Sequence, residues 1–281
     1  MTLSLDDSPG ESGPVRLEKY AARLTAHDIT VGYGPVPVLE KVSVAIPDAE
    51  LTVIVGPNGC GKSTLLRALA RMLPVRGGEV RLDGQPLATY QPKALARRLG
   101  MLPQAPTAPE GIVVADLVAR GRYPHQSLLR QWSPADQAAI EEAMAAANVT
   151  EFAERQVGEL SGGQRQRVWI AMALAQETPI LLLDEPTTYL DIAHQLEVLD
   201  LAQRLHLGGH TVVAVLHELH LAFRYATHLI VMSNGAVVAE GRPGAIVTPE
   251  LIQEVFEVSC RIVADPESGT PMVIPTARSV R

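Results

Sequence analysis

Apolar and polar residues alternate in the first part of the chain, at residues 24–33, 42–46 and 79–84. A period of two places alternate side chains on one face of an extended backbone. The pattern therefore predicts three strands of an antiparallel sheet. Residues 1–20 come before them, and their polar, turn-forming composition favours a disordered tail.

Uninterrupted apolar runs follow at residues 51–55, 180–183, 211–216 and 229–232. Strands that are buried on both faces have this composition. Helix-like segments separate the later runs, and this alternation is typical of a parallel α/β sheet. Asn234-Gly235 comes directly after the last run and before residues 237–239, and it predicts a tight hairpin turn.

The middle of the chain is alanine-rich, and helical periodicity is clearest at residues 115–120 and 135–147. Ser133 and Pro134 before the second segment suit an N-cap and a first helical position. The end of the chain predicts one helix, at residues 249–256, and two short strands. We therefore expect one α/β domain over residues 21–281, with an antiparallel β subdomain, a helical insertion at about 105–175 and a C-terminal extension at about 243–281.

Composition narrows the class of protein. The chain has 281 residues, of which 47% are hydrophobic and 20% charged, as in ordinary soluble domains. It has no run of 18 apolar residues and no basic region followed by an apolar core, so we expect neither a membrane span nor a signal peptide. The net charge of −7 argues against a nucleic-acid partner. Cys60 and Cys260 are too far apart in sequence to suggest zinc-ligand spacing or a disulfide framework, which points to a reducing cytoplasm.

One motif carries specific chemistry. Residues 56–63 read G-x-x-x-x-G-K-S, between the apolar run at 51–55 and a helix-prone stretch. In such a loop, glycines turn the backbone so that its N–H groups point at phosphate oxygens, and the following helix adds its positive end. Lys62 would reach the β- and γ-phosphates, and the hydroxyl of Ser63 would bind Mg²⁺. The motif predicts an ATP site made by Gly56, Pro57, Asn58, Gly59, Cys60, Gly61, Lys62, Ser63 and Thr64.

Two carboxylates end the apolar run at residues 180–183. Asp184 is placed to hold Mg²⁺ through water, and Glu185 could polarise the water that attacks the γ-phosphate. On its own, such a pair only keeps a strand end solvated. After a phosphate loop, we interpret it as catalytic.

A second glycine pair opens a helix. Ser161 is a natural N-cap before the helical segment that starts near Gln164, and Gly162-Gly163 expose backbone N–H groups at the positive helix end. An ordinary capped helix would look the same when taken alone.

Together these motifs resemble those of the ATP-binding subunits of ABC transporters, from about residue 24 to the end. The resemblance implies that Ser161, Gly162, Gly163 and Gln164 form the signature motif, which contacts ATP on the opposite subunit. It also implies further roles: adenine stacking for Tyr33, a metal-site and catalytic loop role for Gln104, the loop after the catalytic glutamate for Thr188 to Asp191, and γ-phosphate contact for His217. Thr188-Tyr189 departs from the usual serine-alanine, which affects the expected geometry across the dimer.

The resemblance extends to cargo. Three parts of the chain are similar to the corresponding stretches in importers of ferric siderophores, haem and vitamin B12. They are residues 118–125, residues 185–199 and a C-terminal run made of residues 248–252, 255–258 and 273–275. The resemblance implies a homodimer, cofactors ATP and Mg²⁺, a membrane permease, an extracytoplasmic binding protein and a peripheral location on the cytoplasmic face of the cell membrane. Import of haem, cobalamin or a metal ion stays open as the alternative cargo. A soluble ATPase acting on DNA or ribosomes and an exporter are further alternatives. In the plainest interpretation of residues 120–125, their arginines are simply solvated.

Overall fold

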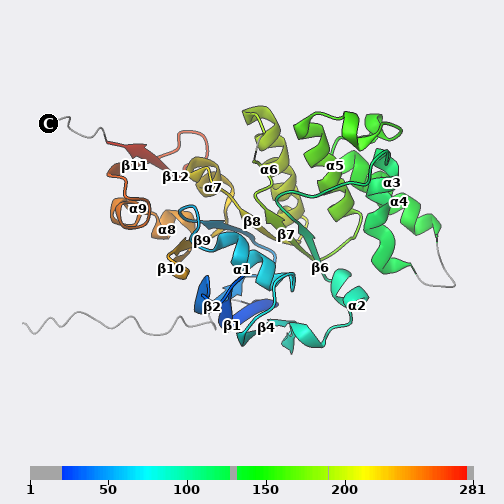
Figure 1. Cartoon of the computed structure of the whole chain (residues 1–281). Coiled ribbons are helices and arrows are strands. Elements are labelled where there is room, and N and C mark those ends of the chain that lie inside the picture. Colours follow the sequence, from blue (N-terminus) through cyan, green and yellow to red (C-terminus); the bar gives the residue numbers. More distant parts are fainter. Residues whose placement is uncertain (1–20, 127–131, 189, 277–281) are drawn as a thin grey trace, which may run out of the picture.

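A six-stranded sheet with the order β10-β9-β3-β8-β7-β6 forms the centre of the computed structural model, which describes residues 21–126, 132–188 and 190–276 (Figure 1). The predicted tail at 1–20 and Tyr189 lie outside the described residues. The strands are β3 (Leu51–Val55), β6 (Leu99–Leu102), β7 (Ile180–Asp184), β8 (Thr211–Val215), β9 (His228–Ser233) and β10 (Ala236–Gly241).

Strands β9, β3, β8, β7 and β6 run parallel to one another, and β10 pairs antiparallel with β9. The apolar runs predicted four of the parallel strands, β3, β7, β8 and β9, but not β6. Every residue of β3, β7 and β8 is buried. Asn234 and Gly235 both have positive φ, of 48° and 78°, which is the backbone of a type I′ hairpin turn. The predicted hairpin is therefore confirmed.

A second, antiparallel sheet has the order β2-β1-β4-β5. Its strands are β1 (Leu24–Val31), β2 (Leu39–Ile46), β4 (Gly77–Leu82) and β5 (Gln85–Pro86). The three predicted strands are present, although β2 begins three residues earlier than its alternation suggests. Leu39 joins it because it pairs with Val31 on β1.

Two apolar clusters cover the two faces of the central sheet. Val53 packs into one with the helices of the middle and end of the chain, and Ile54, its neighbour in β3, packs into the other with β1, β2 and α1. The helices are α1 (Lys62–Leu69), α2 (Pro92–Ala96), α3 (Val114–Ala119), α4 (Pro134–Ala146), α5 (Gly162–Leu174), α6 (Ile192–Leu207), α7 (Leu219–Tyr225), α8 (Pro243–Ile246) and α9 (Pro249–Phe256).

The described residues between β6 and β7 form only helices and turns, apart from one isolated bridge between Val113 and Gln156, and they gather on one side of the molecule (Figure 1). Besides α3, α4 and α5 they include the 3₁₀ segments η3 (Arg120–His125), η4 (Thr150–Phe152) and η5 (Val157–Glu159). Ser133 caps α4 through a capping box with Asp136, as its sequence predicts. The subdomain boundaries at about 105 and 175 stay a prediction.

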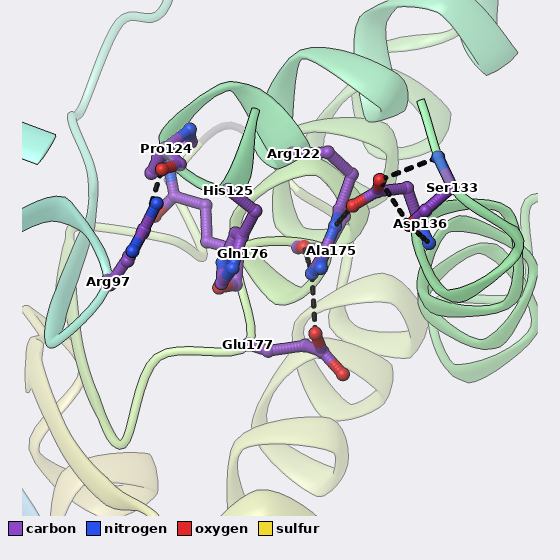
Figure 2. A network of polar contacts seen from close by, with 9 residues as sticks. All are labelled: Arg97, Arg122, Pro124, His125, Ser133, Asp136, Ala175, Gln176 and Glu177. Atoms are coloured by element: carbon purple, nitrogen blue, oxygen red, sulfur yellow. Dashed lines mark hydrogen bonds and ion pairs between the residues drawn. The ribbon is translucent and has the colours of Figure 1, made fainter. Parts of the chain in front are cut away.

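The view that the arginines of residues 120–125 are both solvated is wrong for Arg122. Its side chain is 5% exposed and donates to Asp136, to Glu177 and to the carbonyl of Ala175 (Figure 2). Three segments thus meet at one guanidinium: η3, the start of α4 and the chain after α5. Arg120 is exposed. Sequence spacing could not show this contact, because the partners are 14 and 55 residues away.

After α8 and α9 the described part of the chain forms a separate hairpin of β11 (Cys260–Ala264) and β12 (Pro271–Pro275), which confirms the predicted helix and two strands. A further 3₁₀ turn, η2 (Leu87–Thr89), follows β5. In the described parts of the chain, none of the helices combines the length and the apolar content needed to cross a bilayer.

Candidate functional site

The loop between β3 and α1 has a backbone that only glycine permits at two positions. Gly56 and Gly61 have φ of 154° and 103°. A Cβ on Gly56 would lie 2.1 Å from the carbonyl oxygen of Met232, and one on Gly61 would lie 2.6 Å from Cδ2 of Leu39. The loop is thus packed tightly against β9 and β2, and both glycines of the motif are fixed by geometry.

Lys62 lies inside this loop and is buried. Its Nζ donates to the carbonyl oxygens of Gly56 and Pro57, at 2.8 and 2.9 Å. The ammonium group therefore sits within the curve of the loop, where a phosphate would meet it. Cys60 is buried in the same loop as a free thiol, and burial raises its pKa.

Gly61 is the N-cap residue of α1, and none of the described side chains caps this end of the helix. The first-turn N–H groups of a helix need acceptors, and phosphate oxygens are suitable ones. A cavity of about 300 Å³ opens at this helix end. Its lining is Tyr33, Val38, Asn58, Gly59, Gly61, Lys62, Ser63, Thr64, Glu185 and His217.

Tyr33 lies at the lip of the cavity and is 60% exposed. Such an exposed ring is free to stack on a planar base. Its hydroxyl accepts a hydrogen bond of 3.2 Å from Arg67, on α1. Arg67 is a residue that the sequence did not single out, although it stands one helical turn after Ser63 and hence on the same face.

Asp184, the last residue of β7, is fully buried. Its Oδ2 accepts from Nε of Arg67 at 3.3 Å and forms an ion pair with the same guanidinium at 3.2 Å. Its Oδ1 is buried without a hydrogen-bond partner among the described residues. A buried carboxylate oxygen of this kind requires a partner that is absent from the protein itself.

Oδ1 of Asp184 is a candidate ligand for the predicted Mg²⁺. Mg²⁺ is usually held by one or two carboxylates together with phosphates and waters, and not by a protein cage. Within the described residues there is no group of three or more His, Cys, Asp or Glu side chains that could hold a metal. Oδ1 of Asp184, which has no partner among the described residues, and Ser63, which lines the cavity, fit a Mg²⁺ site with few protein ligands.

Glu185 is the most connected side chain of the site. Its backbone has φ of 52°, in the left-handed region that non-glycine residues seldom adopt. Nε2 of Gln104 donates to Oε2 at 2.5 Å, and Oγ1 of Thr188 donates to the same oxygen at 3.1 Å. Nε2 of His217 lies 2.6 Å from Oε1. Three predicted residues, Gln104, Glu185 and His217, are thus brought together.

The signature motif is not on the wall of this cavity. Ser161 caps α5 through a reciprocal capping box with Gln164. Asp191 caps α6, accepting from the N–H of His194 at 3.0 Å, and its Oδ1 also lies 2.6 Å from Nδ1 of that histidine. The His194 ring packs against Gly163, where an added Cβ would lie 2.9 Å from Cδ2.

The predicted residues therefore form two groups. The phosphate loop, Tyr33, Glu185 and His217 line one cavity or contact it, with Gln104 and Asp184 bonded beside it. Residues 161–164 and Asp191 form a second group, in which Gly163 and Asp191 both lie against His194. Val38, which lines the cavity, and Arg67 were missed; no sequence signal identifies Val38, whereas Arg67 could have been found from its helical spacing to Ser63.

Comparison with known sequences bears on this arrangement. The family profile described as "ABC transporter" matches residues 39–188. The chain is 52% identical to the ferric enterobactin transport ATP-binding protein FepC of Escherichia coli K12, over 92% of this chain and 96% of that protein. It is 50% identical to the probable siderophore transport system ATP-binding protein YusV of Bacillus subtilis, over 91% and 93% of the two chains. The hemin import ATP-binding protein HmuV of Thermobifida fusca is 39% identical, over 93% and 92%.

Solved structures of ABC transporter proteins are also similar to this chain. An inward-facing conformation of a putative metal-chelate type ABC transporter contains a chain that matches with a TM-score of 0.76 and 27% identity, over 91% of this chain and 97% of that one. The dimeric post-hydrolysis structure of the ATP-binding cassette MJ0796 with ADP and Pi matches with a TM-score of 0.69 and 27% identity, over 78% and 98%.

Proposed function

The chain belongs to the ABC transporter family as one of its ATP-binding, ATP-hydrolysing subunits, and we propose that its ATP hydrolysis drives uptake of a ferric siderophore through a membrane permease. The observation that supports a ferric siderophore as the cargo is the 52% sequence identity to a ferric enterobactin transport protein, over 96% of that protein's length. The second siderophore relative, at 50% identity, supports the same class of cargo.

Each residue of the first group has a proposed part in ATP binding. The loop N–H groups and Lys62 hold the β- and γ-phosphates, and Tyr33 stacks on the adenine. Ser63, Asp184 and Gln104 hold Mg²⁺, which when bound neutralises phosphate charge. The support for these roles is that the cavity joins the loop to Tyr33 and Glu185.

Hydrolysis is proposed to depend on Glu185. Its carboxylate would orient and polarise the water that attacks the γ-phosphate. His217 and Gln104 engage opposite oxygens of that carboxylate, at 2.6 and 2.5 Å, so they fix its direction. His217 also lines the cavity and is proposed to contact the γ-phosphate.

The second group is proposed to serve another copy of the chain. Residues 161–164 and Asp191 do not line the cavity of their own chain. In a symmetric dimer, each signature motif would close the ATP site of its partner, and loss of the γ-phosphate would favour opening. The dimeric structure of the similar cassette supports this arrangement.

The permease, an extracytoplasmic binding protein and a peripheral position on the cytoplasmic face of the membrane are further parts of the proposal. Their support is the importer function in the names of the relatives. Hemin is the alternative cargo, favoured by the 39% identity to a hemin import protein.

Uptake of radiolabelled iron–siderophore tests the cargo. Wild-type cells should accumulate label, and cells that carry chromosomal Glu185→Gln should not. Hemin and cobalamin uptake are measured in parallel with the same two strains. Loss of hemin uptake with unchanged siderophore uptake would overturn the siderophore proposal in favour of the alternative.

A further inference from the structure

Arg67 connects Tyr33, on the lining of the cavity, with Asp184, which lies beside the cavity. Its guanidinium contacts Asp184 through Nε and Nη2, at 3.3 and 3.2 Å, and Tyr33 through Nη1, at 3.2 Å. Asp184 stands on the metal side and Tyr33 on the base side of the proposed site. One side chain therefore bridges the groups proposed to hold Mg²⁺ and adenine.

The contact with Asp184 compensates a buried charge. Asp184 is fully buried, and Arg67 is the one cationic side chain within ion-pair distance of it among the described residues. Lys62, the other nearby cation, donates instead to the carbonyls of Gly56 and Pro57. An isolated buried carboxylate is strongly unfavourable, so Arg67 stabilises the site when no other cation is present.

The same contact opposes metal binding. Oδ2 of Asp184 is engaged with Arg67, and only Oδ1 is left without a partner. A dication near this carboxylate would compete with the guanidinium for Oδ2 and be repelled by its charge. Nη1 of Arg67 donates to the hydroxyl of Tyr33, and this second contact holds the guanidinium in position.

We propose that Arg67 is a positioning residue that holds Asp184 and Tyr33 in the nucleotide-free subunit and gives up both contacts as the Mg²⁺–nucleotide complex binds. This rests on the function proposed above. Turning the Tyr33 ring onto a base would break its bond to Arg67, which would weaken the restraint on the guanidinium. Base stacking at one end of the cavity and metal holding at the other are thereby coupled through one side chain.

The test is binding of ADP to the full-length protein, by titration calorimetry, in Mg²⁺ and in EDTA. The measured quantity is the ratio of the two affinities. Arg67→Met removes the competing charge, and we expect this ratio to rise by about fivefold or more, the lower end of typical coupling between sites. Tyr33→Phe keeps the ring and removes the hydroxyl, and it should shift the ratio in the same direction by less.

Two further variants separate the proposal from nonspecific effects. Arg81→Met removes an arginine that pairs with Glu79 on the antiparallel sheet, and it should leave the ratio at the wild-type value. Arg67→Lys keeps a cation beside Asp184 and should restore most of the wild-type ratio. A merely structural arginine would change both affinities together and leave their ratio unmoved.

Binding of Mn²⁺ alone, followed by its electron paramagnetic resonance signal, gives an independent readout. Arg67→Met should bind Mn²⁺ more tightly than wild type, and its melting temperature without ligands should be lower. Normal ADP binding with an unchanged ratio and unchanged Mn²⁺ affinity would overturn the role of Arg67 alone. Failure of the wild-type protein to bind ADP in either buffer would overturn the proposed function and the coupling with it.

Discussion

Nε2 of His217 and Oε1 of Glu185 lie only 2.6 Å apart, although the two residues follow different strands of the sheet, β8 and β7. Gln104 and Thr188 donate to the other carboxylate oxygen. Both oxygens of Glu185 are therefore engaged by neighbouring side chains. An attacking water would have to share or replace one of these contacts.

Glu185→Gln should remove most ATP hydrolysis while leaving ATP binding intact. The neutral amide has no basic oxygen with which to polarise water, and such positioned bases contribute about 10²–10⁴-fold to rate. The variant should also accumulate as an ATP-bound dimer in gel filtration. Turnover at the wild-type rate would show that the carboxylate has no such role.

Lys62→Ala provides the contrast for that variant. Loss of the ammonium group removes the charge proposed to meet the phosphates, so nucleotide binding itself should weaken. Equilibrium binding of ATP separates the two variants: Glu185→Gln should bind like wild type, whereas Lys62→Ala should not.

Gly163→Ala should destabilise the start of α5 by about 1–3 kcal/mol, the range expected for overpacking. Its new methyl would lie 2.9 Å from the His194 ring, whose Nδ1 is tied to Asp191. Urea unfolding measures the effect. Gly162→Ala is the matched control, because no atom outside the adjoining chain and helix backbone lies within 4 Å of a Cβ at that position. If His194→Ala does not relieve the penalty of Gly163→Ala, the ring is not its cause.

Arg122→Met should lower the free energy of unfolding by about 3–5 kcal/mol, because it leaves the buried carboxylate of Asp136 without its cationic partner. Chemical denaturation should show this loss, while Arg120→Met, at an exposed position two residues earlier, should stay within about 0.5 kcal/mol of wild type. Equal effects of the two substitutions would contradict the network in Figure 2.

Tyr225 predicts a loss of stability in alkali. Burial and its hydrogen bond to Asp200 raise the pKa of Tyr225 to about 12, from 10.0. The folded state thus favours the neutral phenol: this stabilisation is complete below pH 10 and is lost as the pH rises to about 12. Unfolding measured across this range should show a smaller fall in stability for Tyr225→Phe than for wild type. Equal slopes would show that the phenol does not contribute.

The sequence predicted the parts of the fold whose signal is local. The phosphate loop was found because its glycines, Gly56 and Gly61, are required by backbone geometry at fixed positions. The strands β3, β7 and β8 were found because they are buried on both faces and therefore apolar throughout. β6 was not predicted, since it has only four residues and one of them is Gly100.

Contacts between distant segments were beyond local patterns. Arg122 looked like a solvated arginine because its partners come from later segments, Asp136 from α4 and Glu177 from the chain after α5. A role for Gln104 at the metal site was expected from family resemblance alone, and its contact with Glu185, 81 residues away, was not predicted. The contact of Arg67 with Asp184 spans 117 residues and was not predicted.

The position of β3 has a consequence for how the molecule opens. β3 pairs with β8 on one side and β9 on the other, and all five of its side chains are buried. Each of its ladder amide hydrogens points to one of these two buried neighbours and can reach solvent only when that ladder separates, so these amides should exchange with deuterium as slowly as global unfolding permits. The phosphate loop begins directly after this strand. Local opening of other segments should therefore leave β3 paired with its neighbours and the start of the loop in place.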